Sequence, residues 1–179
     1  MAEKFLTFSK DYDNALGGLV IVANEVEFTM LYCITRLLYG VNYTKRDFNT
    51  ILCLAGSENF DVVLSKLDKL IRTFFPDNEP LIDSFLKIKI SLDNGNKKRN
   101  KYIHSSWSPS ENGLASRLKL LRAMKDKKLY DTEKNVNIQD IINATYEFEA
   151  ATDSLLDFMN TLDKENPNEE NTTQAPQEN

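Results

Sequence analysis

Apolar residues at helical spacing are the sequence feature that most limits how this chain can fold. Between Asp11 and Tyr39 an apolar side chain returns every three or four residues, which is the period of a helix with one buried face. Gly40 follows directly and predicts the end of that helix. A helix of this length has to bury its apolar stripe against other elements. The first part of the chain therefore predicts a long core helix.

Later parts of the chain repeat the same period. The runs lie between Thr44 and Gly56, from Ser57 as cap to Phe74, from Pro80 to Trp107, and from Ile138 to Leu162. Phe75-Pro76-Asp77 separates two of them, and Asn94-Gly95-Asn96 could interrupt the third. Long amphipathic helices joined by short loops pack against one another. The sequence therefore predicts an all-α fold, an antiparallel bundle of four to five long helices.

Residues 108–137 differ in kind from the rest. Ser108–Gly113 has the composition of a loop. The residues that follow fit two structures equally well: a small β-hairpin insertion around 114–136, or a charged helix from Arg117 to Lys128. The sequence leaves both open.

The C-terminal residues predict a boundary. Residues 1–162 form the expected bundle domain, and residues 163–179 are polar and acidic, which predicts a disordered tail. Five acidic residues and one lysine give this tail a net charge of −4, which leaves −1 of the total −5 for residues 1–162. The local arrangement of charge therefore decides what the domain can bind.

The compartment follows from the cysteines and the N-terminus. Cys33 and Cys53 lie in apolar helical patterns without a second ligand at metal-binding spacing, so we expect buried, reduced thiols and no metal or cofactor. The N-terminus lacks the features of a signal peptide. The apolar stretch from Leu16 to Ala23 is shorter than the roughly 20 residues that span a bilayer. We expect a cytoplasmic protein with no membrane partner.

The only histidine of the chain stands in its most informative segment. If the helix continues to Trp107, Asn100 and His104 lie at i and i+4, where a hydrogen bond could fix the imidazole tautomer. Trp107 would pack beside the imidazole, and Arg99 could swing toward it. Histidine can move protons near neutral pH, and the guanidinium matches phosphate oxygens. These residues suit RNA cleavage by attack of the 2′-hydroxyl on the adjacent phosphate.

Two questions surround this chemistry. Lys97, Lys98 and Lys101 are either an RNA-binding patch or a solvated helix face. The reaction uses both a base and an acid, whereas the chain has one histidine. A symmetric homodimer would bring two copies of His104 and Arg99 into one site.

Arg99-Asn100-Lys101-Tyr102-Ile103-His104 resembles the R-x4–6-H motif of HEPN domains, in which a polar residue often follows the arginine. The resemblance implies a helical bundle that dimerises with the motif at the interface. It also implies a metal-independent endoribonuclease of a toxin–antitoxin, abortive-infection or CRISPR-related phage-defence system, which leaves 2′,3′-cyclic phosphate ends. Arg99 and His104 would be catalytic and Asn100 would assist. RNA would be the substrate, and an antitoxin or another protein the partner.

The sequence departs from the family at two positions, and it leaves other functions open. Ser106 stands where HEPN toxins paired with a nucleotidyltransferase antitoxin often have a tyrosine that is modified, and Gly95 shortly precedes the motif. One alternative is a non-catalytic HEPN-type module that binds RNA, a nucleotide or a protein partner. Another is a helical scaffold in which the motif is a coincidence.

Overall fold

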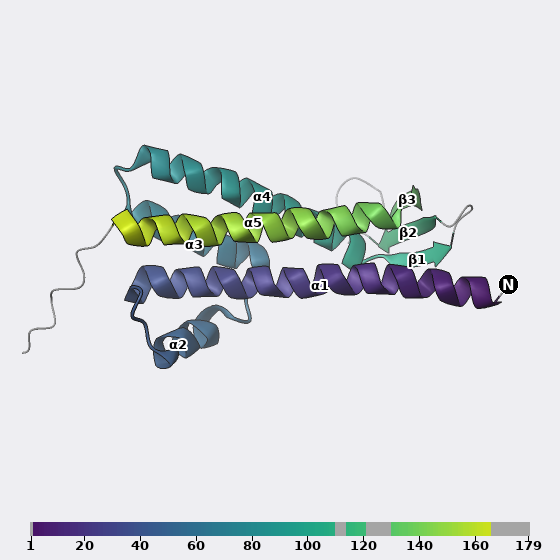
Figure 1. Cartoon of the computed structure of the whole chain (residues 1–179), viewed down its shortest axis with the longest axis horizontal. Helices are drawn as coiled ribbons and strands as arrows, with labels where there is room; N and C mark the ends of the chain where they lie inside the picture. The colour runs from purple at the N-terminus through teal and green to yellow at the C-terminus, as the bar shows by residue number, and fades with distance from the viewer. Residues whose placement is uncertain (1, 110–113, 121–129, 166–179) are drawn as a thin grey trace, which may run out of the picture. The chain divides into compact units, whose positions relative to one another are not determined.

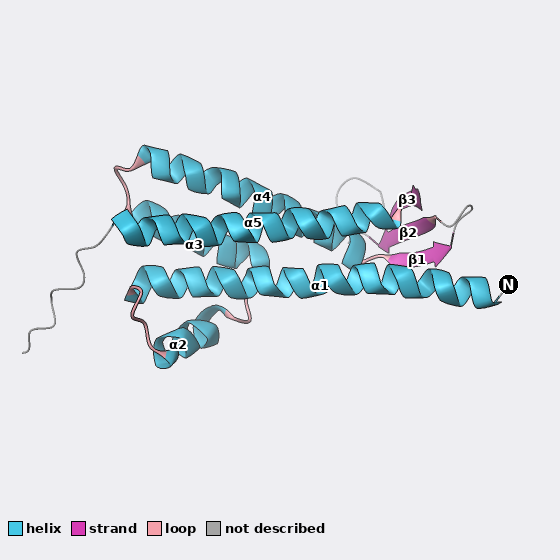
Figure 2. Cartoon of the chain, viewed as in Figure 1, coloured by secondary structure: helices cyan, strands magenta, loops and turns pink. Residues whose placement is uncertain are grey.

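The computed structural model describes residues 2–109, 114–120 and 130–165 (Figure 1). Its elements are α1 (Ala2–Tyr39), α2 (Lys45–Ala55), α3 (Phe60–Phe74), α4 (Glu79–Ile103), β1 (Ser106–Pro109), β2 (Ala115–Leu120), β3 (Tyr130–Val136) and α5 (Ile138–Glu165). Helices dominate this described part, and the three strands form one small sheet (Figure 2). The structure confirms the predicted all-α bundle with a small β insertion. Residues 166–179 of the predicted disordered tail lie outside the described part.

The chain forms two compact units, and α1, α4 and α5 each contribute to both. The first unit comprises Met1–Val26 and Ile90–Ala151, and the second comprises Glu27–Lys89 and Thr152–Asn179. The sheet and the predicted site residues belong to the first unit.

The core of the first unit brings α4 and α5 into close contact at a glycine. Leu92 and Phe148 are fully buried there, and a Cβ added to Gly95 would lie 2.3 Å from Cδ2 of Phe148. Helix α4 runs without a break through residues 94–96, so the interruption that the sequence allowed there does not occur. Gly95 is explained by the close approach of an aromatic ring to the helix backbone.

The second unit buries apolar faces of all five helices. Its most deeply buried apolar side chains are Met30, Cys33, Leu67, Ile71, Phe85, Leu155 and Met159. Burial raises the pKa of the Cys33 thiol to about 12. Cys53 is exposed, so the expectation of two buried thiols was right only for Cys33. Helix α2 turns Ile51 and Ala55 inward, and this places Cys53 on its outer side.

Local hydrogen bonds set the helix ends of this unit. Helix α1 ends at Gly40, whose φ of 76° suits glycine and whose N–H donates to the carbonyl of Arg36. Thr44 and Asp47 form a capping box at the start of α2. The predicted cap at Ser57 was wrong, because the chain first makes a turn after Ala55 and Asn59 becomes the residue before α3.

Between Lys10 and Tyr39, helix α1 also has the length and composition of a membrane span, and a window of 18 residues within it has a mean hydropathy of 1.4. Apolar core helices of soluble proteins have the same composition. Leu19, Val26 and Met30 of this helix are fully buried. Burial of these side chains in the core explains why α1 carries apolar residues at these positions.

The sheet has the strand order β1-β2-β3, with antiparallel neighbours. Strands β2 and β3 confirm the hairpin around 114–136, and β2 rules out a helix that begins at Arg117; residues 121–129 lie outside the described part. Strand β1 was not predicted, since the helical pattern was expected to continue to Trp107. Tyr12 of α1 donates a hydrogen bond to the carbonyl of Val136 and stacks on Trp107, which holds the sheet against α1.

Replacing Gly95 with alanine should destabilise the protein, because the new methyl group would press on the buried ring of Phe148. Overpacking of a core costs about 1–3 kcal/mol, which exceeds the gain of about 1 kcal/mol from alanine in a helix. We expect Gly95→Ala to lower the free energy of unfolding in urea by up to about 2 kcal/mol, the difference between the two contributions.

Gly18→Ala is the matched control, since no atom lies within 4 Å of the position of its Cβ. This change should leave the free energy of unfolding unchanged or raise it by up to about 1 kcal/mol. Equal stability of the two variants would contradict the packing described for Gly95.

Candidate functional site

The predicted catalytic residues lie together where α4 ends. Arg99 and Asn100 belong to the last turns of the helix and are half-buried. His104 is the first residue after the helix, and its side chain is exposed. The structure therefore brings all three residues to one end of one helix.

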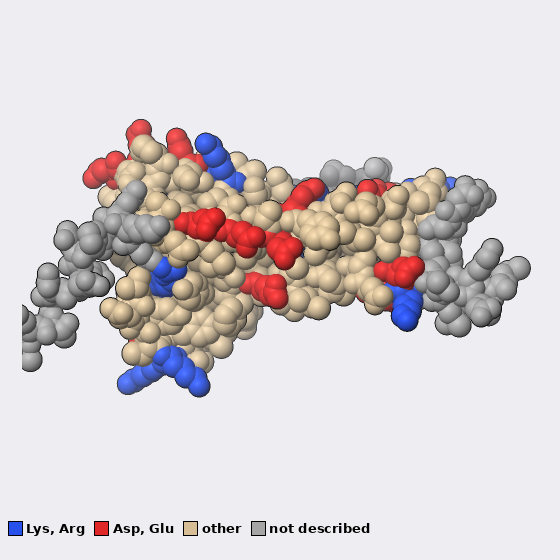
Figure 3. Space-filling model, viewed as in Figure 1, with Lys and Arg blue, Asp and Glu red and all other residues tan. Residues whose placement is uncertain are grey.

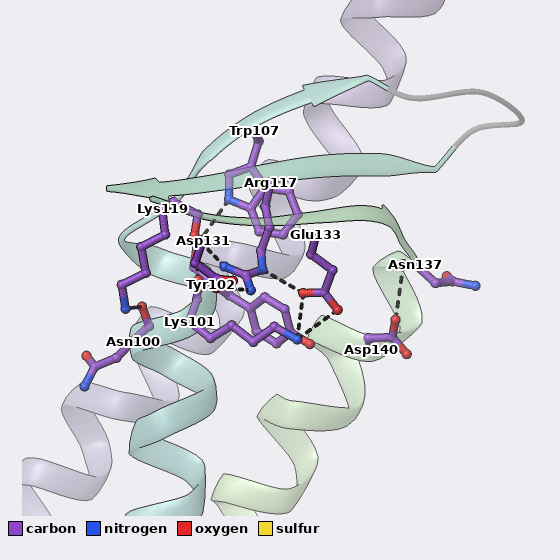
Figure 4. Close-up of polar contacts among 11 residues, drawn as sticks. Asn100, Lys101, Tyr102, Trp107, Arg117, Lys119, Asp131, Glu133, Asn137 and Asp140 are labelled. Carbon is purple, nitrogen blue, oxygen red and sulfur yellow. Dashed lines mark hydrogen bonds and ion pairs between the residues drawn. The ribbon is translucent and has the colours of Figure 1, made fainter. Parts of the chain in front are cut away.

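Side chains from beyond the helix bind the carbonyl groups of this last turn (Figure 4). The bonds run from Lys119 Nζ to the carbonyl of Asn100 at 2.6 Å, from Ser105 Oγ to that of Lys101 at 2.6 Å, and from Trp107 Nε1 to that of Tyr102 at 3.1 Å. The last carbonyls of a helix have no partner within the helix, and a cation there also interacts favourably with the helix dipole. The sheet and the turn before it therefore cap α4.

Trp107 occupies a different place from the one predicted. It lies in β1, and its ring centroid is 5.9 Å from that of Tyr12 and 6.1 Å from that of Tyr102. Helix α4 ends at Ile103, four residues earlier than the apolar pattern indicated. The indole packs in the first unit and binds a helix carbonyl, so the expectation that it continues the helix beside His104 was wrong.

Asn100 and His104 both lie in the described part of the chain, and they do not form the hydrogen bond that the sequence predicted. The spacing i, i+4 brings side chains together only on a continuous helix, and His104 lies outside α4. The side-chain oxygen of Asn100 instead accepts a hydrogen bond from Arg99 Nη1 at 3.5 Å. Asn100 is thus placed to orient the guanidinium.

Each of the three lysines predicted to bind RNA faces a carboxylate. Lys97 pairs with Asp93 at 2.6 Å, Lys98 pairs with Glu147, and Lys101 pairs with Glu133 at 2.7 Å. Other acidic side chains follow α5 on the face drawn in Figure 3. A phosphate that approaches these lysines has to compete with the carboxylates, which weakens the local positive potential.

Sequence reasoning missed Arg117, the most buried charged residue of the first unit. Its side chain is 4% exposed, and its guanidinium binds Glu133 and Asp131, each at 2.7 Å. Arg117 Nη1 also lies 3.5 Å from Ser105 Oγ, next to His104. Arg117 on β2 pairs with Glu133 on β3. This ion pair could therefore be predicted only by someone who already knew the register of the hairpin.

The pKa values of this ion-pair network follow from its geometry. Burial alone would lower the pKa of Arg117 and raise that of Glu133. Hydrogen bonds and the attraction of opposite charges together outweigh burial in both cases. Asp131 and Glu133 therefore raise the pKa of Arg117, and Lys101 and Arg117 lower that of Glu133. The network therefore stabilises the charged forms of Arg117 and Glu133, and the ion pair of Lys101 with Glu133 joins the sheet to α4.

The groups that could act on a ligand here are Arg99, Asn100, His104 and Lys119. Within the described residues, no three His, Cys, Asp or Glu side chains are grouped to hold a metal ion. Arg99 and Lys119 offer positive charge, and His104 offers an exposed imidazole. This set can bind an anionic group and move a proton.

Replacing Glu133 with glutamine should destabilise the protein at neutral pH, because buried Arg117 loses one of its two carboxylates. We expect a loss of about 1–3 kcal/mol in the free energy of unfolding at pH 7. The lowered pKa of Glu133 means that its contribution is fully present above its unfolded pKa of about 4.3 and is lost as the pH falls through the folded value. The difference between wild type and Glu133→Gln should therefore shrink below pH 4.

Glu147→Gln provides the control, since Glu147 pairs with Lys98 on the surface with its side chain 60% exposed. Exposed pairs contribute roughly 0–1 kcal/mol, so little change is expected at any pH. A constant difference between wild type and Glu133→Gln from pH 7 to pH 3 would contradict the role given to this carboxylate.

Comparisons with known proteins assign no family to this chain. No protein-family model matches it, and neither the curated proteins nor the solved structures contain a match.

Proposed function

We propose that this protein is a metal-independent endoribonuclease of the HEPN type. The observation that carries the proposal is that Arg99 and Asn100, in the last turns of α4, are followed directly after the helix by exposed His104. The helical fold agrees with the resemblance of Arg99–His104 to the HEPN motif. A cytoplasmic setting in phage defence or a toxin–antitoxin pair, with an antitoxin or other protein partner, belongs to the same proposal.

In the proposed reaction the 2′-oxygen of RNA attacks the adjacent phosphorus. His104 accepts the proton of the 2′-hydroxyl, the bond from phosphorus to the 5′-oxygen breaks, and that oxygen receives a proton. Arg99 stabilises the negative charge that develops on the phosphate, and Asn100 holds the guanidinium. The products carry a 2′,3′-cyclic phosphate and a 5′-hydroxyl.

A homodimer would complete this chemistry. The chain has one histidine, and a second copy would supply the second proton-transfer group at a site on the two-fold axis. Ile21 of α1 and Ile90 of α4 are large exposed apolar residues of the first unit, and they are candidates for burial in such an interface. Ser106 at the position of the modified tyrosine argues for a different means of control.

One observation favours a second candidate, a non-catalytic module that binds RNA, a nucleotide or a protein. In the described part of the chain, the side-chain amide of Asn100 contacts Arg99 and not His104. Asn100 therefore does not fix the orientation of the imidazole. Binding of a phosphate needs only the positive charge of the site, whereas turnover needs an oriented proton acceptor.

RNA cleavage in EDTA tests the proposed enzyme. We expect His104→Ala to lower the rate by about 10²–10⁴-fold, the range typical for loss of a general acid or base. Arg99→Ala should lower it by about 10²–10³-fold through loss of transition-state stabilisation. Product ends are measured together with the rate.

Arg46→Ala serves as the control, because Arg46 is exposed on α2 in the second unit, and it should cleave at the wild-type rate. Folding of each variant is checked by circular dichroism. Equal cleavage by wild type and His104→Ala would contradict the proposed role of His104, and RNA binding without cleavage by wild type would favour the non-catalytic module.

A further inference from the structure

Lys119 differs from the other lysines near the motif in what its ammonium group contacts. Lys97, Lys98 and Lys101 each face a carboxylate. Lys119 binds the neutral carbonyl of Asn100 at 2.6 Å. We infer that Lys119 is the lysine that binds an RNA phosphate at this site, beside Arg99. This inference rests on the proposed function, which it extends by a residue that belongs to no recognised motif.

The position of Lys119 on the sheet explains why no carboxylate among the described residues pairs with its ammonium group. Its neighbour across the β2–β3 pairing is Asp131, but the carboxylate of Asp131 binds Arg117 at 2.7 Å. Figure 4 shows Lys119 reaching toward Asn100, away from Glu133. Within the described part of the chain, Lys119 forms no ion pair with an acidic side chain. Its hydrogen bond uses one of the three donors of the ammonium group.

Two cations meet at Asn100 from different sides. Arg99 Nη1 lies 3.5 Å from the side-chain oxygen of Asn100, and Lys119 Nζ lies 2.6 Å from its main-chain oxygen. A phosphate bound within reach of both cations would be attracted to each of them. The planar guanidinium would fix the orientation of the phosphate, while the ammonium acts as a point charge.

The rival interpretation is that Lys119 only caps α4. A cap contributes to stability through the helix dipole, but it does not change how strongly RNA binding depends on salt. Each phosphate contact made by a lysine adds about 0.7 to the magnitude of the slope of log K against log salt for a single strand. The salt dependence of binding therefore separates the two roles.

The test measures binding of a single-stranded 2′-O-methyl RNA oligonucleotide, which has no free 2′-hydroxyl and cannot be cleaved, across a range of KCl concentrations. Lys119→Met should reduce the slope by about 0.7 and weaken binding about fivefold at 0.1 M salt. Lys119→Arg should retain the wild-type slope. Lys97→Met is the matched control, because its ammonium is already paired with Asp93, and it should change the slope by less than half as much.

Each outcome decides the inference. A Lys119→Met variant that folds and binds with the wild-type slope would overturn it, and Lys119 would then be a helix cap. An equal change of the salt slope in Lys97→Met would also overturn the inference, since the slope would then reflect the loss of any positive charge near the site and not a phosphate contact of Lys119. These outcomes leave the proposed nuclease standing, which the cleavage assay with His104→Ala tests separately. Wild-type protein that does not bind the oligonucleotide at all would overturn the inference, and the cleavage assay would still decide the proposed nuclease.

Discussion

The carbonyl groups at the end of α4 need hydrogen-bond partners, and the arrangement of the candidate site depends on how they are supplied. Lys119, Ser105 and Trp107 bind three successive carbonyls of the last turn. The helix ends at Ile103 as a result, and the chain turns into β1. His104 lies at that turn, where its imidazole is exposed instead of packed along a helix face. The small sheet therefore determines how the only histidine is presented.

Charge around the site divides into structural and available groups. Arg117 is buried between Asp131 and Glu133, so its charge holds the sheet together and does not face a ligand. Three lysines on or near the motif are balanced by carboxylates. Lys119 binds the main-chain oxygen of Asn100 and forms no ion pair within the described part of the chain, and Arg99 contacts the side-chain oxygen of Asn100. In a chain with a net charge of −5, a small positive site of this kind can bind phosphate where the total charge cannot.

Periodic patterns in the sequence predicted most of the helical fold, because a helix that buries one face has apolar residues every three or four positions along the chain. Gly40 and Thr44 also marked helix ends correctly, since capping acts between near neighbours. The end of α4 was missed because its carbonyls are bound by residues of another element, such as Lys119. Arg117 was missed for the same reason, as its partners lie on the next strand. Arg99, Asn100 and His104 could be named from the sequence, whereas their contacts could not.

The central claim is that the end of α4 forms a site for RNA cleavage through the 2′-hydroxyl. The most direct measurement uses an RNA that the wild-type protein cuts in EDTA, and replaces the nucleotide 5′ to the cleaved bond with its 2′-deoxy form. The account predicts that cleavage at that bond is abolished and that the unmodified RNA yields 2′,3′-cyclic phosphate and 5′-hydroxyl ends. Cleavage of the deoxy-substituted bond at the same rate would contradict it, because the attacking oxygen would then come from elsewhere.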